Sequence, residues 1–237
     1  MQEQTDKEPK SLVQDENSMI REIIATEAAY LECIRVTVEV GLLEYMPLFV
    51  TSEPNKVKLM KRLQSLVFGA IEDVYVYHTN MIYPDIIVLK DVEDARLAEK
   101  FAEAIAEKKD YFDAYGFYVQ ARPASKMLLA YNLGQHKSLQ LIDEALSVAN
   151  KTREELERVL QEPINRVRKY AKALAKIISK MALDDPEIDL LSDAFAAVDL
   201  EEAYKTAVAE WAAERIKDCP VDLQLVFSGK KLILFNS

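Results

Sequence analysis

The segment LQEPINRVRKYAKALAKIISKM, residues 160–181, has apolar side chains at alternating steps of four and three. That spacing places them along one side of an α-helix. They are Leu160, Ile164, Val167, Ala171, Leu174, Ile178 and Met181. Glu162 and Pro163 suit a first turn. Proline lacks the N–H that would be unsatisfied there, and the helix dipole stabilises an acidic side chain at this end. The segment therefore predicts a long helix with one side in a core.

The opposite side of this predicted helix is polar. At 3.6 residues per turn it carries Asn165, Lys169, Lys172 and Lys176, with Arg166 and Tyr170 on the flank between the two sides. A solvated lysine face is the ordinary interpretation of such a stripe, and a surface for a partner is the alternative.

The order PINRVRKY resembles the most recognisable helix of the Dbl-homology domain. In that family a proline, a polar residue and an arginine precede a lysine–tyrosine pair, and the matching positions are Pro163, Asn165, Arg166, Lys169 and Tyr170. Domains of this family activate Rho-type small GTPases by releasing bound GDP. The resemblance implies that Lys169, with Asn165, Arg166 and Lys172 around it, contacts a GTPase near its switches.

A second helix is predicted from Ser18, with apolar residues along one face. These residues are Ile20, Ile24, Leu31, Ile34, Val38 and Tyr45, and Glu27 lies in the middle of them. A carboxylate on an apolar face needs a partner. It could pair with a basic side chain from a neighbouring helix, or the face could open to water or a ligand.

The stretch EIIATEAAYLECI, residues 22–34, carries the second resemblance. Dbl-homology domains begin with a helix in which a Thr–Glu pair precedes an aromatic residue by three positions, as Thr26, Glu27 and Tyr30 do here. The family's glutamate reaches the first switch of the GTPase, and the resemblance implies that role for Glu27. LVFGAIEDVYVYH, residues 66–78, is similar to a further conserved block, in which His78 would be a core or groove residue rather than a metal ligand.

The remaining pattern predicts further helices and two short strands. Helices are expected over residues 57–81, 91–109, 111–132 with an interruption near Pro123, 139–148, and from 184–186 to about 218. Thr152 and Glu155 form a capping box just before the central helix. Ala213 stands where the family has an asparagine that contacts the second switch. VDLQLVF and KKLILF, on either side of a Ser228–Gly229 turn, alternate as strands do.

Composition narrows the function further. Half of the 237 residues are hydrophobic and the formal net charge is −10, which argues against nucleic-acid binding. Two cysteines fit a reducing compartment, and no apolar run reaches the length of a membrane span. The sequence contains no glycine-rich phosphate loop, metal-ligand spacing or nucleophile elbow. We therefore expect no cofactor, no metal, no catalytic residue and no covalent chemistry.

Together these observations predict an all-α, elongated Dbl-homology-type bundle of about six main helices with a short C-terminal β segment. The expected divisions are a flexible tail over residues 1–17, a helical domain over 18–218, and a strand linker or the start of a pleckstrin-homology-like domain over 219–237. The resemblance implies a cytoplasmic exchange factor for a Rho-family GTPase, acting in cytoskeletal regulation and cell polarity. Such a further domain would allow recruitment to the plasma membrane or cell cortex.

Two alternatives remain open at this point. The first is a non-catalytic scaffold that keeps the helical fold and binds a GTPase or other proteins, which Asn165 and Ala213 favour as departures from the family pattern. The second is a membrane-curving helical dimer, which needs a basic face and fits the net charge of −10 poorly.

Overall fold

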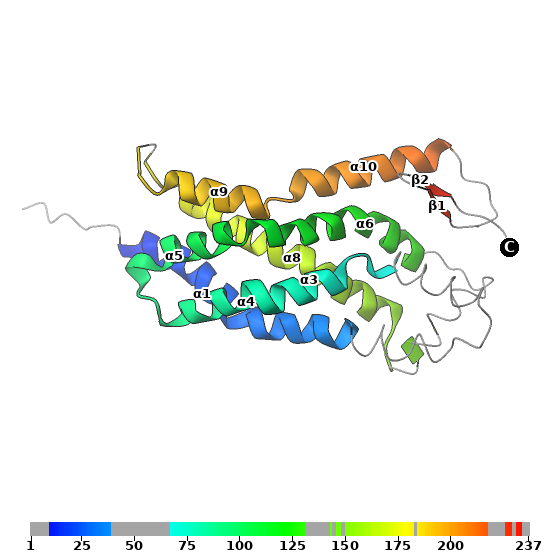
Figure 1. Ribbon diagram of the computed structural model, residues 1–237, viewed down its shortest axis with the longest axis horizontal. Helices are drawn as coiled ribbons and strands as arrows, with labels where there is room; N and C mark the ends of the chain where they lie inside the picture. The colour runs from blue at the N-terminus through cyan, green and yellow to red at the C-terminus, as the bar shows by residue number, and fades with distance from the viewer. Residues whose placement is uncertain are drawn as a thin grey trace, which may run out of the picture. The chain divides into compact units, whose positions relative to one another are not determined.

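The structure is a computed structural model that describes residues 10–38, 67–130, 143, 146–147, 150–182, 184–217, 226–228 and 231–233. Most of these residues are helical, which confirms the predicted all-α class (Figure 1). Six of the described helices have ten or more residues: α1 (Lys10–Val36), α5 (Asp94–Glu107), α6 (Asp113–Ala130), α8 (Arg153–Ile178), α9 (Ile188–Val198) and α10 (Glu201–Lys217).

Shorter elements connect and follow these helices. They are α3 (Ile71–Tyr77), the π-helix η3 (His78–Ile82), α4 (Tyr83–Ile87), the 3-10 helices η4 (Val88–Asp91) and η5 (Lys109–Phe112), and the strands β1 (Val226–Ser228) and β2 (Lys231–Ile233). The two strands pair antiparallel, with Phe227 opposite Leu232. That these strands begin a further domain stays a prediction. Among the described helices, none pairs the length of a bilayer span with the apolar composition such a span requires.

The chain divides into two compact units, and α1 and α8 contribute residues to both. Unit 1 comprises Met1–Glu32, Tyr75–Asp113 and Ile164–Asp199, and unit 2 comprises Cys33–Val74, Ala114–Pro163 and Leu200–Ser237. Each unit has its own buried side chains.

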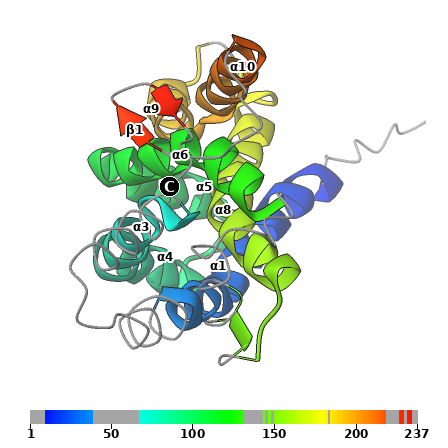
Figure 2. The same ribbon diagram turned by 90° about the vertical axis from the view of Figure 1, so that its right-hand side faces the viewer.

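The core of unit 1 forms where α5 and α9 lie side by side (Figures 1 and 2). It continues where aromatic rings surround Tyr170. The ring of Tyr170 is fully buried, and it meets Phe101 edge to face at 5.6 Å and Phe112 at 6.2 Å between ring centroids. Such edge-to-face contacts add to the free energy gained by burying the rings. They fix the rotation of α8 within unit 1.

In unit 2, buried polar side chains join α6 to its neighbours. The Tyr118 hydroxyl donates to the Leu160 carbonyl, and burial raises the pKa of this phenol. Arg122 donates to Glu157 at 2.8 Å and to the Ser125 hydroxyl at 2.6 Å. These bonds hold α6 and the first part of α8 together, although Arg122 Nε and Glu157 Oε2 are buried without a hydrogen-bond partner among the described residues.

The start of α8 was partly predicted correctly. The Thr152 hydroxyl accepts from the Glu155 N–H at 3.1 Å, and the Glu155 carboxylate accepts from the Thr152 N–H at 2.8 Å, which confirms the capping box. The expectation that Pro163 lies in the first turn is wrong, because the capping box starts the helix ten residues earlier and Pro163 lies inside α8. The helix continues past the proline at the cost of one backbone hydrogen bond.

Other boundaries also differ from the sequence prediction. α1 begins at Lys10 rather than Ser18, and α6 runs through Pro123 without the expected interruption. The single helix expected from residue 186 to about 218 is two helices, because Asp199 leaves the helical conformation with ψ at 88°. Glu201 and Glu202 then lie in the first turn of α10, where the helix dipole favours acids.

Two expected helices lie partly outside the described residues. Of residues 57–81, the structure describes 67 onward, and the helical turn there is broken at Gly69. Of residues 139–148, it describes three, all helical.

A π-helical turn interrupts the helical run from α3 to α4. The Tyr83 N–H donates to the His78 carbonyl five residues earlier, and Pro84, at the start of α4, has no N–H to donate. In an α-helix, residues four apart are displaced from each other by about 40° around the helix axis. The wider π turn reduces this displacement, so that His78, Ile82 and Ile86 all face the core.

Gly69 provides a test of the turn that precedes α3. Its φ of +55° is in the left-handed region, and an added Cβ would lie 3.1 Å from the Ala121 Cβ. We expect Gly69→Ala to lower the free energy of unfolding by about 1–2 kcal/mol in urea denaturation. Gly116→Ala is the matched control: its Cβ would meet nothing within 4 Å inside α6, so it should be neutral or stabilising by about 0.5–1 kcal/mol. Equal effects of the two substitutions would contradict this account of Gly69.

Candidate functional site

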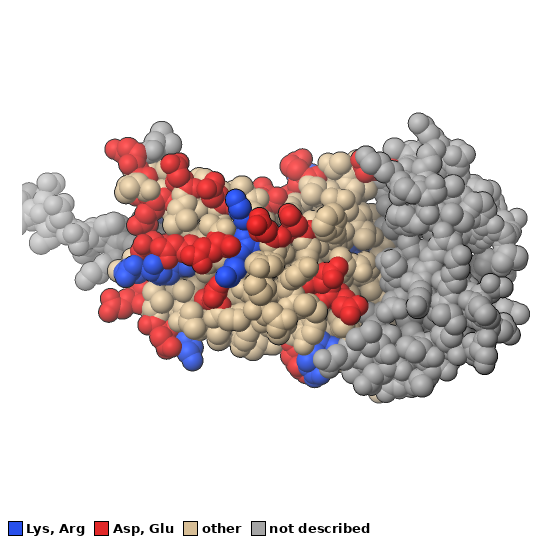
Figure 3. Space-filling view, in the orientation of Figure 1, with Lys and Arg blue, Asp and Glu red and all other residues tan. Residues whose placement is uncertain are grey.

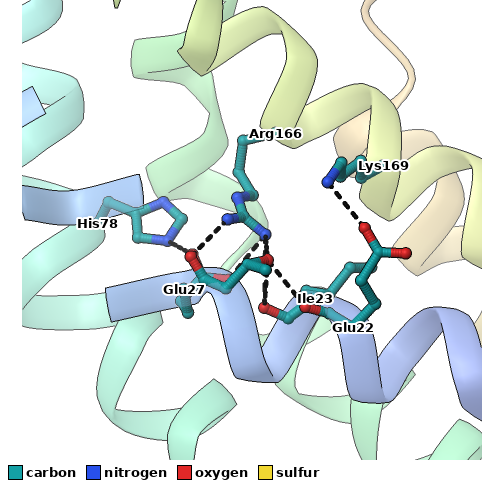
Figure 4. A network of polar contacts seen from close by, with 7 residues as sticks. Glu22, Ile23, Glu27, His78, Arg166 and Lys169 are labelled. Atoms are coloured by element: carbon teal, nitrogen blue, oxygen red, sulfur yellow. Dashed lines mark hydrogen bonds and ion pairs between the residues drawn. The ribbon is translucent and has the colours of Figure 1, made fainter. Parts of the chain in front are cut away.

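Three buried polar side chains meet in unit 1, each from a different segment: Glu27 from α1, His78 from η3 and Arg166 from α8 (Figure 4). The side chains of Glu27 and His78 are 0% exposed and that of Arg166 is 5% exposed. His78 Nε2 lies 2.5 Å from Glu27 Oε1, and Arg166 Nη1 lies 3.5 Å from Glu27 Oε2. We call these three residues the buried network.

Arg166 is bound to α1 by more than the ion pair. Its Nη1 donates to the Thr26 hydroxyl at 3.1 Å and to the Ile23 carbonyl at 3.4 Å, and its Nη2 donates to the Thr26 carbonyl at 2.9 Å. The guanidinium also lies 4.8 Å from the centroid of the Tyr30 ring, within the range of a cation–π interaction. Its planar fork of donors therefore contacts two turns of α1 at once.

The electrostatics of the buried network are those of a compensated pair. A carboxylate without a partner in this position would cost several kcal/mol, and the guanidinium supplies the opposite charge. The Tyr30 ring meets the His78 ring edge to face at 5.2 Å, so aromatic groups enclose the network. This geometry corresponds to the alternative that a basic side chain from a neighbouring helix pairs with Glu27. Direct contact between Glu27 and a GTPase stays a prediction.

An exposed ion pair lies beside the buried network. Lys169 Nζ is 3.0 Å from Glu22 Oε1, and the two side chains are 47% and 62% exposed (Figure 4). Sequence reasoning identified Lys169 but missed Glu22. The signal was available, because Glu22 is five residues before Glu27 and therefore lies about 140° away around α1. If one of these carboxylates is buried, the other must face outward.

The remaining predicted site residues differ in how far they are exposed to solvent. Lys172 is exposed on the same side of α8 as Lys169, and Asn165 is half-buried. The sequence placed Arg166 and Tyr170 on the flank of α8, but both are buried, so the buried side of the helix is wider than the apolar seam. Ala213 lies in α10, in a part of that helix whose side chains the structure does not describe.

The comparisons with known proteins assign the family. The sequence profile of the RhoGEF domain matches residues 19–201, which is more than half of the chain. The chain belongs to the RhoGEF domain family. The match includes Glu22, Glu27, His78, Arg166 and Lys169 and ends before Ala213. A search of curated proteins finds no match.

Solved structures support the same fold. One, described as showing a critical structural role for the PH and C1 domains of the Vav1 exchange factor, is 20% identical with a TM-score of 0.57, over 86% of this chain and 52% of that one. A second, Vav1 with an allosteric inhibitor that blocks its exchange activity, is 21% identical with a TM-score of 0.53, over 86% and 34%. An activated truncation of Vav1 is 19% identical with a TM-score of 0.51, over 84% and 48%. The chain therefore spans about a third to a half of these structures.

The two ion pairs of this RhoGEF domain should respond differently to truncation. Arg166→Ala leaves the Glu27 carboxylate buried without its counter-charge, and we expect it to lower the free energy of unfolding by about 3–5 kcal/mol. Lys169→Ala removes one member of an exposed pair and should change it by about 0–1 kcal/mol. Urea denaturation followed by circular dichroism measures both. An Arg166→Ala variant as stable as Lys169→Ala would show that the buried pair does not form.

Proposed function

We propose that this chain is a guanine nucleotide exchange factor that binds a Rho-family small GTPase and promotes GDP release. Membership of the RhoGEF domain family supports this proposal, as does the resemblance of the α8 sequence to the family's most recognisable helix. The observation that carries it is the position of Lys169. This lysine belongs to the family motif, yet it is exposed and paired with an exposed carboxylate rather than used in the core.

The proposed contact surface consists of Glu22 on α1 and Asn165, Lys169 and Lys172 on α8. The α8 part of this surface belongs to a basic segment, because residues 163–183 contain six basic residues and no acid in a chain of net charge −10. By contrast, acidic side chains are spread over the face shown in Figure 3. Such local concentration of positive charge speeds the encounter with an oppositely charged partner.

Exchange of this kind requires differential binding and no covalent step. A surface that binds the nucleotide-free GTPase more tightly than the GDP-bound form shifts the population toward loss of GDP. Each tenfold difference in affinity between the two forms corresponds to about 1.4 kcal/mol. Glu22 and Lys169 can exchange their mutual contact for contacts with the GTPase switches at little cost to the fold, because their pair is exposed.

The structure favours Glu22 over Glu27 as the carboxylate that meets the GTPase. Glu27 could reach a partner only by breaking its contacts with His78 and Arg166, which would leave buried polar groups unsatisfied. We therefore assign the direct contact to Glu22 and a supporting position to Glu27. Recruitment of the protein to a membrane through a following pleckstrin-homology-like domain belongs to the same proposal.

The second candidate is a scaffold that binds a GTPase without releasing its nucleotide. Ala213 favours it, because alanine has no polar group to offer at the position where the resemblance places an asparagine. Both functions use the same surface and differ in whether GDP leaves.

An exchange assay with surface variants tests the proposal. Against a panel of Rho-family GTPases loaded with fluorescent GDP, Glu22→Ala and Lys169→Ala should each slow release from the responsive GTPase about tenfold, or 1.4 kcal/mol. Lys205→Ala is the control, because Lys205 forms a similar exposed pair with Glu202 at 2.9 Å on α10. That variant should release GDP at the wild-type rate. Binding of a GTPase by the wild type without faster release would favour the scaffold.

Substitution at Ala213 tests the register of the resemblance. If the family's asparagine belongs there, Ala213→Asn should raise the rate of GDP release severalfold by adding a polar contact to the GTPase. Ala212→Asn, one residue away on α10, is the matched control and should have no such effect. An equal response of the two variants would show that the register is wrong.

A further inference from the structure

We infer that the buried network of Glu27, His78 and Arg166 positions the exposed pair of Glu22 and Lys169, so that exchange depends on residues that do not touch the GTPase. This inference rests on the proposed function and extends it. It assigns Glu27, His78 and Arg166 as positioning residues.

The first argument is the shared footprint of Arg166 and Lys169. They are three residues apart on α8, one turn of the helix, and so lie on neighbouring positions of its surface. Arg166 bonds to Ile23, Thr26 and Glu27 of α1, and Lys169 pairs with Glu22. The buried and the exposed contacts therefore join the same turns of α1 and α8.

The second argument is one of energy. An exposed lysine–carboxylate pair contributes about 0–1 kcal/mol, which is too little to fix two helices against each other. The Arg166 guanidinium makes directional bonds to a hydroxyl and to backbone carbonyls, and these break if α8 slides by one residue, about 1.5 Å. The exposed pair therefore takes its geometry from the buried one.

The third argument concerns the role of His78. Its Nε2 contacts Oε1 of Glu27, whereas Oε2 finds no hydrogen-bond partner among the described residues and meets Arg166 as an ion pair at 3.5 Å (Figure 4). The π turn of η3 directs the imidazole into the core at this point. The short contact with the imidazole therefore orients the carboxylate, and the oriented carboxylate places its second oxygen opposite the Arg166 guanidinium.

A double-mutant cycle tests the coupling. Glu27→Gln keeps the size and the hydrogen-bonding capacity of the side chain but removes its charge, and Arg166→Lys keeps the charge but loses the planar fork. Each should slow GDP release about tenfold in the wild type and less than twofold in a Lys169→Ala background, because the positioned lysine is then already missing. Losses that multiply in the double variants would overturn the inference.

The control for stability lies in unit 2. Arg122 and Glu157 form a chemically similar pair, with the Arg122 side chain 3% exposed, and neither belongs to the proposed surface. Glu157→Gln and Arg122→Lys should lower the melting temperature but leave the rate of GDP release unchanged at a temperature where all variants are folded. If they slow release as much as Glu27→Gln does, the network acts only through stability and the inference fails.

A measurement without a GTPase separates this inference from the proposed function. In a Cys33→Ser, Cys219→Ser background, a short bismaleimide should link Glu22→Cys to Lys169→Cys rapidly, because those positions are adjacent. Adding Arg166→Lys should slow the linking about tenfold, since misplacement of about 1 Å strongly slows intramolecular reactions. His78→Asn should slow it in the same direction, and Arg122→Lys should not. Unchanged linking in Arg166→Lys overturns the positioning role, and slowed linking without any GDP release in the wild type overturns the proposed function alone.

Discussion

A buried carboxylate is the constraint on which unit 1 depends. Glu27 lies on the face of α1 that otherwise carries isoleucine, leucine and tyrosine, and it is fully buried. Its burial requires a counter-charge from another helix, which limits how α8 can approach α1. Replacing the pair by apolar residues of the same volume could leave the fold as stable, so stability alone does not explain it. What the pair adds is a single relative placement of the two helices.

That placement has a consequence at the surface. Lys169 is one helical turn beyond Arg166, and Glu22 is little more than one turn before Glu27, so fixing the inner residues fixes the outer ones. Exposed ion pairs are weak and exchange partners easily, which fits the proposed contact of Glu22 and Lys169 with a GTPase. The buried pair of Glu27 and Arg166 thus holds the two helices in place, and the neighbouring exposed pair of Glu22 and Lys169 is able to change partners.

Much of this could be predicted from the sequence, and the misses have physical causes. The apolar period predicted the buried residues Ile20, Ile24 and Leu31 of α1 and Leu160, Ile164, Val167 and Leu174 of α8. It placed Arg166 and Tyr170 on the flank because a period describes one helix, whereas their burial depends on rings and carbonyls that other segments supply. The π turn at His78 and the continuation of α8 past Pro163 also depend on tertiary contacts that local propensity does not record.

The sequence motif alone does not show which of two carboxylates, Glu22 or Glu27, faces outward from α1. Glu22 and Glu27 both lie in EIIATEAAYLECI, and the resemblance draws attention to the second because it belongs to the Thr–Glu pair. Helical geometry separates the two by about 140°, so they cannot both face the same partner. Because Arg166 and His78 occupy the side of Glu27, only Glu22 is left to face outward beside Lys169. In the proposed arrangement Glu27 lies outside the contact surface, and its contacts with Arg166 and His78 determine where Glu22 and Lys169 lie.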